Sequence, residues 1–234
     1  MKFNFKNGNL ILLLSIVCTY VLSLFLMPKI TLHFLNITEA GQRYYVLLFW
    51  QVIAIVIMTI IIQKNGLNSL ENTNQRYGFL KSVGKGMSFF FIMMLLQMIL
   101  SIILQILAHI FSFNPVSQNT QEISLAIKSQ PIIILYVVVF APILEELVFR
   151  KAIFAYLYDI INTSREKLRF ILAAFLSGLI FAIPHDGISP IAIVYIVMAM
   201  IFAYLYKKTS NIIAPITAHI LMNLAVIIVQ INLA

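Results

Sequence analysis

The sequence predicts an all-α, polytopic integral membrane protein, a helical bundle of about seven transmembrane helices with its amino terminus inside and its carboxy terminus outside. Of its 234 residues, 62% are apolar and 10% are charged, whereas soluble domains average about 45–50% apolar and about 25% charged residues. The mean hydropathy is +0.99, and a water-soluble fold could not cover so much apolar surface. A disordered chain, a coiled coil, a disulfide scaffold and a soluble α/β enzyme are therefore excluded.

Seven apolar segments underlie this prediction, most of them near the roughly 20 residues that cross a 30 Å hydrocarbon core. They are residues 10–27, 44–62, 87–111, 131–149, 168–185, 190–206 and 212–231. The first resembles a secretory signal but lacks a small-residue cleavage site, so we expect it to be a retained span. Residues 113–130 leave room for an eighth, short or re-entrant segment. We expect residues 1–234 to form one transmembrane domain, with a motif-bearing catalytic core at 131–231.

The basic residues predict the orientation, because the cytoplasmic loops of membrane proteins carry an excess of Lys and Arg. When the loops are assigned alternately, Lys29, Arg43 and Lys128 fall on one side of the membrane. The other 13 basic residues, including Arg150 and Lys151, fall on the opposite side, which is predicted to be the cytoplasm.

The net charge of +8 does not indicate a nucleic-acid partner, because the basic residues lie between apolar runs and no nucleic-acid motif is present. The lipid bilayer is the predicted partner. The longest cytoplasmic connection is expected at residues 63–86, where its basic residues can lie on an anionic membrane surface.

Two adjacent carboxylates, Glu145 and Glu146, lie inside the apolar segment 131–149. A charge at the bilayer centre costs about 2.5–3.5 kcal/mol even on a lenient scale, so the pair is expected to face protein or a water-filled cavity. Glu146 and Arg150 are four residues apart with the acid first, the better order for a helical ion pair. Glu145 lacks that partner and is suited to act as a general base toward water. The alternative is that both glutamates only bond helices together.

Two histidines lie in similar intramembrane pairs. Phe181 and His185 share one helical face, and so do His219 and Asn223. Either imidazole alone could be an ordinary helix contact. Together with the carboxylates, however, they match metal-assisted or acid–base hydrolysis.

Other chemistries lack their signatures in this chain. No Ser or Cys has the adjacent base that activates a nucleophile. The zinc-protease pattern H-E-x-x-H, a P-loop and a Rossmann glycine pattern are absent.

At these residues the sequence resembles the CPBP family of intramembrane proteases, which includes the CAAX prenyl endopeptidases and bacterial bacteriocin-processing or Abi proteins. The family's three motifs are Glu-Glu-x-x-x-Arg, Phe-x-x-x-His and His-x-x-x-Asn, and all occur here in that order. Their positions are Glu145, Glu146 and Arg150; Phe181 and His185; His219 and Asn223. The resemblance covers about residues 131–231 and leaves the first three spans without a motif.

The resemblance implies a role for each of these residues. Glu145 corresponds to the water-activating base, and Glu146 to its partner held by Arg150. His185 and His219 correspond to imidazoles that bind a metal or polarise the scissile carbonyl. The oxyanion donor corresponds to Asn223, and Phe181 lies near the site. One divalent metal, zinc, stays a conditional cofactor, with the ligands Glu145, His185 and His219.

The resemblance also implies an integral-membrane endopeptidase of a bacterial cytoplasmic membrane that cleaves peptide or protein substrates near the cytoplasmic face. Bacterial members are associated with maturing small secreted peptides and with self-immunity to bacteriocins. A catalytically silent immunity or binding protein and a transporter remain alternatives, and the oligomeric state is left open. We expect the three motifs to meet at mid-depth in a water-accessible cavity, with the Glu145 helix continuing to Asp159.

Overall fold

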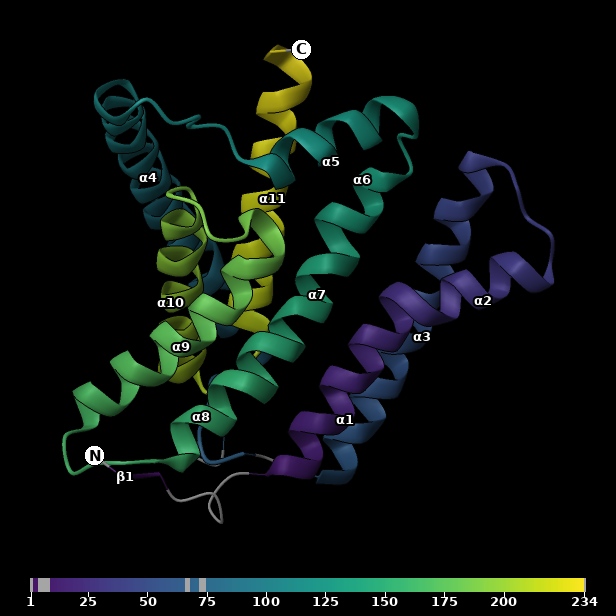
Figure 1. Ribbon diagram of the computed structural model, residues 1–234. Helices are drawn as coiled ribbons and strands as arrows, with labels where there is room; N and C mark the ends of the chain where they lie inside the picture. Colours follow the sequence, from purple (N-terminus) through teal and green to yellow (C-terminus); the bar gives the residue numbers. More distant parts are fainter. Residues whose placement is uncertain (1, 4–8, 66–67, 72–74, 234) are drawn as a thin grey trace.

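The computed structural model describes residues 2–3, 9–65, 68–71 and 75–233, and these residues form a bundle of helices (Figure 1). In chain order, with η marking π-helical segments, the helical elements are α1 (Leu10–Val21), η1 (Leu22–Leu26), α2 (Met27–Phe34), α3 (Ala40–Asn65), α4 (Phe79–Phe111), α5 (Gln118–Ser129), α6 (Ile133–Leu135), η2 (Tyr136–Phe140), α7 (Ala141–Glu145), η3 (Glu146–Phe154), α8 (Ala155–Ile160), α9 (Glu166–Asp186), α10 (Ala192–Thr209) and α11 (Ile213–Leu233). Strands β1 (Lys2–Phe3) and β2 (Ile161–Asn162) pair in an antiparallel manner.

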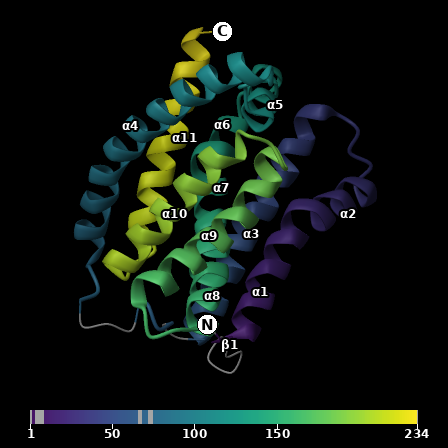
Figure 2. The ribbon, with the colours of Figure 1, turned by 60° about the vertical axis from the view of Figure 1, so that its left-hand side comes forward.

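The all-α polytopic fold is confirmed. Within the described ranges, six helical runs are long and apolar enough to cross a membrane. The predicted segment 131–149 lies in a further run, α6 to α8, which is helical without a break from Ile133 to Ile160. The runs alternate in direction, so that β1 and the end of α11 lie at opposite ends of the bundle (Figures 1 and 2). This arrangement agrees with seven passes, and the orientation across the membrane stays a prediction.

The predicted bounds of the cytoplasmic loop, residues 63–86, are wrong at both ends. Helix α3 continues to Asn65, and α4 begins at Phe79 rather than at residue 87. No proline interrupts residues 79–86, so the lysines in that stretch do not stop the helix. At 33 residues, α4 is about 50 Å long and extends past the hydrocarbon core.

Residues 113–130 contain a short eighth segment, the helix α5, as the sequence leaves room for. Its 12 residues make a helix about 18 Å long, too short to cross the bilayer. Figure 1 shows α5 lying across the end of the bundle that also carries the end of α11. We refer to this as the α5 end of the bundle.

Arg150 and Lys151 do not lie in a cytoplasmic loop, as the sequence predicts, but are buried within η3. Lys151 forms an ion pair with Glu71 from the α3–α4 connection, and Arg150 pairs with Glu146. Each cation can remain inside the protein because it has a carboxylate partner. Removing these two residues from the predicted cytoplasmic set of 13 leaves 11, against 3 on the other side, so the predicted orientation is unchanged.

Helices α4 and α11 touch most closely at Gly86. A Cβ atom at this position would lie 2.6 Å from the carbonyl oxygen of Ala214 and 2.7 Å from Cβ of Thr217. Only glycine therefore allows this approach. At the α5 end, by contrast, the ends of α4 and α11 lie apart (Figure 1).

We predict that Gly86→Ala destabilises the protein by about 1–3 kcal/mol, because the added methyl group overpacks a backbone contact. Gly84→Ala is the matched control, since nothing lies within 4 Å of a Cβ atom there. Thermal unfolding of both purified variants in detergent measures the difference. Equal melting temperatures for the two variants would contradict the close contact.

Candidate active site

The three predicted motifs meet in space. Glu145 ends α7 and Glu146 begins η3, His185 lies in the last turn of α9, and His219 lies in α11. The distance from Glu145 Oε2 to His219 Nε2 is 3.7 Å, and to His185 Nε2 it is 4.0 Å. The helix that carries Glu145 continues to Ile160, as expected, which places the carboxylate near the middle of its run.

Glu146 is fully buried and held by two partners. His219 Nδ1 lies 2.8 Å from Glu146 Oε1, and Arg150 Nε lies 3.1 Å from Glu146 Oε2. One carboxylate thus receives a cation and a hydrogen-bond donor, which offsets the cost of its burial. This agrees with the structural role that the family resemblance implies for Glu146.

Arg150 lies between two aromatic rings. Its guanidinium carbon is 4.6 Å from the ring centroid of Phe181 and 4.9 Å from that of Phe202. Within the described structure, none of its nitrogens has a well-aligned hydrogen bond to protein. The ion pair and the two ring faces therefore compensate its charge. Sequence reasoning found Phe181 but missed Phe202, whose ring also stacks on His219 with centroids 4.8 Å apart.

The hydrogen-bond partners define the tautomers of both imidazoles. His185 Nδ1 lies 2.8 Å from the carbonyl oxygen of Phe181, and His219 Nδ1 lies 2.8 Å from a carboxylate oxygen of Glu146. Neither the carbonyl nor the ion-paired carboxylate donates, so each Nδ1 carries a proton. A ring in its neutral form then keeps its lone pair on Nε2.

Three acceptor atoms therefore face one another: Glu145 Oε2 and the Nε2 atoms of His185 and His219. Their separations of 3.7 and 4.0 Å exceed a direct hydrogen bond. Converging acceptors repel unless a donor or a cation lies between them. A water molecule, a proton or a metal ion would meet that requirement.

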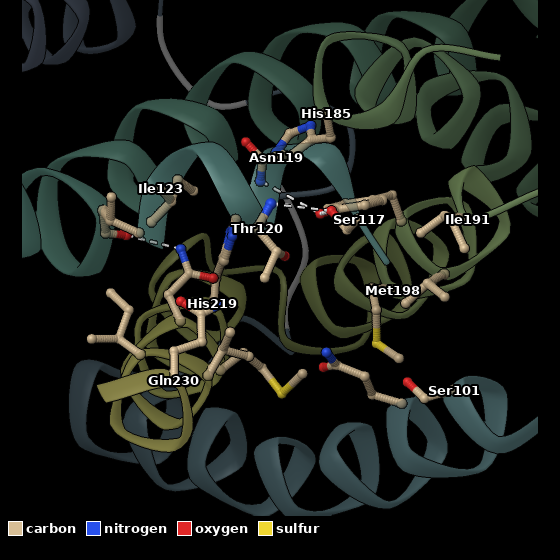
Figure 3. Close-up of a pocket in the computed structure, with 18 of the residues that line it drawn as sticks. Ser101, Ser117, Asn119, Thr120, Ile123, His185, Ile191, Met198, His219 and Gln230 are labelled. Carbon is tan, nitrogen blue, oxygen red and sulfur yellow. Dashed lines mark hydrogen bonds between the residues drawn. The ribbon is translucent and has the colours of Figure 1, made fainter. Parts of the chain in front are cut away.

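The acceptors border a cavity of about 440 Å³. Glu145, His185, His219 and Asn223 line it, and Figure 3 shows His185 and His219 among the lining side chains. Glu146 and Arg150 are not among the lining residues. The two adjacent glutamates thus have different surroundings, one in the cavity wall and one inside the protein.

Asn223 lies where an oxyanion donor would be useful, but it also has a structural contact. Its Nδ2 donates to the carbonyl of Val137 at 2.8 Å. An amide nitrogen carries two protons, so the second remains able to donate toward the cavity. The catalytic role of Asn223 stays a prediction.

The sequence reasoning missed a polar cluster beside His185. Asp186 accepts from the Ser117 hydroxyl at 2.6 Å and from the backbone N–H of Gln118 at 2.7 Å. The Tyr195 hydroxyl lies 2.9 Å from Ser117 Oγ, and its ring packs on His185 with centroids 4.7 Å apart. This cluster fixes the start of α5 to the residue that follows His185. The sequence shows Asp186, but its hydrogen-bond partners Ser117 and Gln118 precede it by about 70 residues, so no local pattern links them.

The donor set suits zinc by its chemistry, since two imidazoles and one carboxylate form a common catalytic ligand set. Ligand atoms in a tetrahedral zinc site lie about 3.4 Å apart, given bonds near 2.1 Å. The two measured separations are wider, and no group of three His, Cys, Asp or Glu side chains in the described part of the chain has the spacing of a metal site. A zinc ion would therefore require these side chains to move slightly closer together.

Comparison with known proteins confirms the resemblance for the motif-bearing part of the chain. Residues 127–225 match the Rce1-like family of type II CAAX prenyl endopeptidases, and this segment contains all three motifs. No solved structure matches the chain.

Several bacterial proteins are similar to the chain. YdiL of Bacillus subtilis (strain 168), named as a membrane peptidase, is 38% identical over 53% of this chain and 48% of its own length. MroQ of Staphylococcus aureus (strain USA300), named as a membrane-embedded CAAX protease, is 38% identical over 60% of this chain and 55% of its own. The protein YxdF of Lactococcus lactis is 29% identical over 37% of this chain. The chain spans about half the length of the first two relatives.

The apolar helices of this chain and its bacterial relatives together identify it as a multi-pass bacterial membrane protein.

We predict that Arg150→Ala destabilises the protein by about 3–5 kcal/mol, because it leaves Glu146 buried without its cation. Arg43→Ala is the control, since this arginine is exposed and surface substitutions change stability by about 0.5 kcal/mol or less. Thermal unfolding in detergent measures both variants. A loss no larger than that of the control would show that Glu146 does not depend on Arg150.

Proposed function

We propose that the chain is an intramembrane endopeptidase in which Glu145 activates a water molecule for attack on a peptide bond. The observation that carries the proposal is the set of three converging acceptors on the cavity. A water molecule between them would donate one proton to Glu145 and one to an imidazole. Support also comes from the matched family and from two relatives, YdiL and MroQ, whose names refer to a peptidase and a protease.

The proposed reaction conserves atoms and protons. Glu145 takes a proton from the water while the water oxygen bonds to the scissile carbonyl carbon. The carbonyl oxygen becomes an oxyanion, for which the free N–H of Asn223 is the donor we propose. Glu145 then returns the proton to the leaving nitrogen as the C–N bond breaks, which gives a carboxyl and an amine.

The buried residues would act by holding the side chains that line the cavity in position. Glu146 accepts the Nδ1 proton of His219 and thereby keeps the Nε2 lone pair of that ring toward the cavity. Arg150 pairs with Glu146 and holds it in place. His185 is positioned in the same way by the carbonyl of Phe181.

A bound zinc ion would polarise the carbonyl and acidify water. Glu145, His185 and His219 would hold it. Glu145 cannot at once be a zinc ligand and the base that accepts the proton. Metal analysis of the purified wild type and Glu145→Gln variant would separate the two roles, because only loss of a ligand lowers the zinc content.

We predict that Glu145→Gln lowers turnover by about 10²–10⁴-fold, because general-base assistance is removed while the side-chain volume is kept. Glu39→Gln is the control, since Glu39 is exposed and outside the cavity. The assay uses the purified protein in proteoliposomes with a library of quenched fluorogenic peptides. Unchanged turnover in Glu145→Gln would refute the proposed base. A cellular phenotype that survives this variant would favour a binding or immunity protein.

A further inference from the structure

The cavity is lined mainly from the half of the bundle that carries α5. Its lining residues include residues within 97–105 of α4, 194–202 of α10 and 219–230 of α11. The α4 residues lie in the half of that helix nearer the α5 end, whereas those of α10 and α11 reach from that half to slightly past the middle of each helix (Figure 1). The segment 115–123, which includes the start of α5, covers the cavity at that end, and Figure 3 shows Ser117, Asn119 and Thr120 beside it.

Among the described residues the opposite half of the bundle is closely packed, and we call it the closed half, with the closed end of the bundle at its tip. Helices α4 and α11 are in contact at Gly86, so no channel passes between them there. Leu205 and Tyr206 of α10 are fully buried, and the Lys151–Glu71 ion pair is buried beside η3. The described structure therefore gives the cavity no lining residue at this end.

The charges assign sides to these two ends. Lys29, Arg43 and Lys128 belong to the half with α5, whereas Lys64, Arg76, Arg165 and Lys207 belong to the closed half. An excess of Lys and Arg marks the cytoplasmic side. The closed end is then cytoplasmic, and the α5 end is not.

We propose that the candidate active site opens to the non-cytoplasmic side of the membrane and receives an uncharged, extended peptide segment from that side. The inference rests on the proposed endopeptidase function for its substrate. It differs from the cleavage near the cytoplasmic face that the family resemblance implies, and cysteine labelling separates the two sides of access. Water and peptide reach Glu145 beneath the segment 115–123.

The cavity walls define the substrate class. Apart from Glu145, His185 and His219, the lining side chains are uncharged. Gln97, Ser101 and Gln105 of α4 are four residues apart and form one polar stripe along the cavity. Side-chain amides can both donate and accept, as the exposed N–H and C=O groups of an extended peptide require.

A charged substrate side chain would have no partner in most of this space. Its desolvation would not be compensated, because no lysine, arginine or aspartate lines the cavity. Peptide segments with apolar or small polar residues around the scissile bond therefore fit, and segments with charged residues there do not.

Cysteine accessibility in intact cells tests the side of access. In a Cys18→Ala background, which removes the native cysteine, Ser101→Cys reports on the cavity, Gln121→Cys on α5 and Lys208→Cys on the closed end. A membrane-impermeant maleimide is expected to label the first two in intact cells, and Lys208→Cys only after permeabilisation. Ser101→Cys that reacts only after permeabilisation, or in neither condition, would overturn the proposal, as would labelling of Lys208→Cys in intact cells.

The labelling result is independent of catalysis. Glu145→Gln added to the Ser101→Cys protein is expected to leave labelling unchanged, so a failed base assignment and a failed side of access give different results. In the peptide assay, a Lys or Asp beside the scissile bond is expected to slow cleavage by about 10-fold or more. Equal cleavage of charged and uncharged peptides would overturn the substrate class.

Discussion

The burial of Glu146 is the constraint on which the rest of the site depends. A carboxylate without exposed surface in a membrane helix needs a cation and a donor, and Arg150 and His219 provide them. Supplying these partners brings η3 and α11 together, and the rings of Phe181 and Phe202 bring α9 and α10 to Arg150. The network that neutralises one charge therefore also brings together four of the helical runs that line the cavity.

The two adjacent glutamates lie in different environments because the helix changes its form between them. Glu145 is the last residue of α7, and Glu146 is the first residue of the π-helical segment η3. π-Helical turns occur often at functional sites. Here the wider turn begins at the point where one carboxylate enters the protein interior and its neighbour faces the cavity. The result is an ion-paired carboxylate inside the protein and a cavity-lining carboxylate in consecutive positions.

The sequence predicted most of the features that depend on the spacing of residues along a helix. The helical class, the i,i+4 pairs and the convergence of Glu145, His185 and His219 are all present. Residues whose roles come from distant partners could not be predicted: Phe202, Tyr195 and Asp186 act through contacts between helices. For the same reason Lys151 was assigned to a loop, because its partner Glu71 precedes it by 80 residues and no periodicity links them.

The Lys151–Glu71 ion pair has a consequence for the modularity of the chain. The family match begins at residue 127, which suggests that the carboxy-terminal half is a self-sufficient unit. Yet Glu71 lies in the connection that follows α3, and Leu12 and Ile16 of α1 pack against Leu144 and Val148. A fragment limited to the motif-bearing half would keep all three motifs, but it would leave Lys151 without its carboxylate partner and would expose one side of the helix that carries Glu145. The first three helices, although free of motifs, are thus part of the structure that supports the candidate active site.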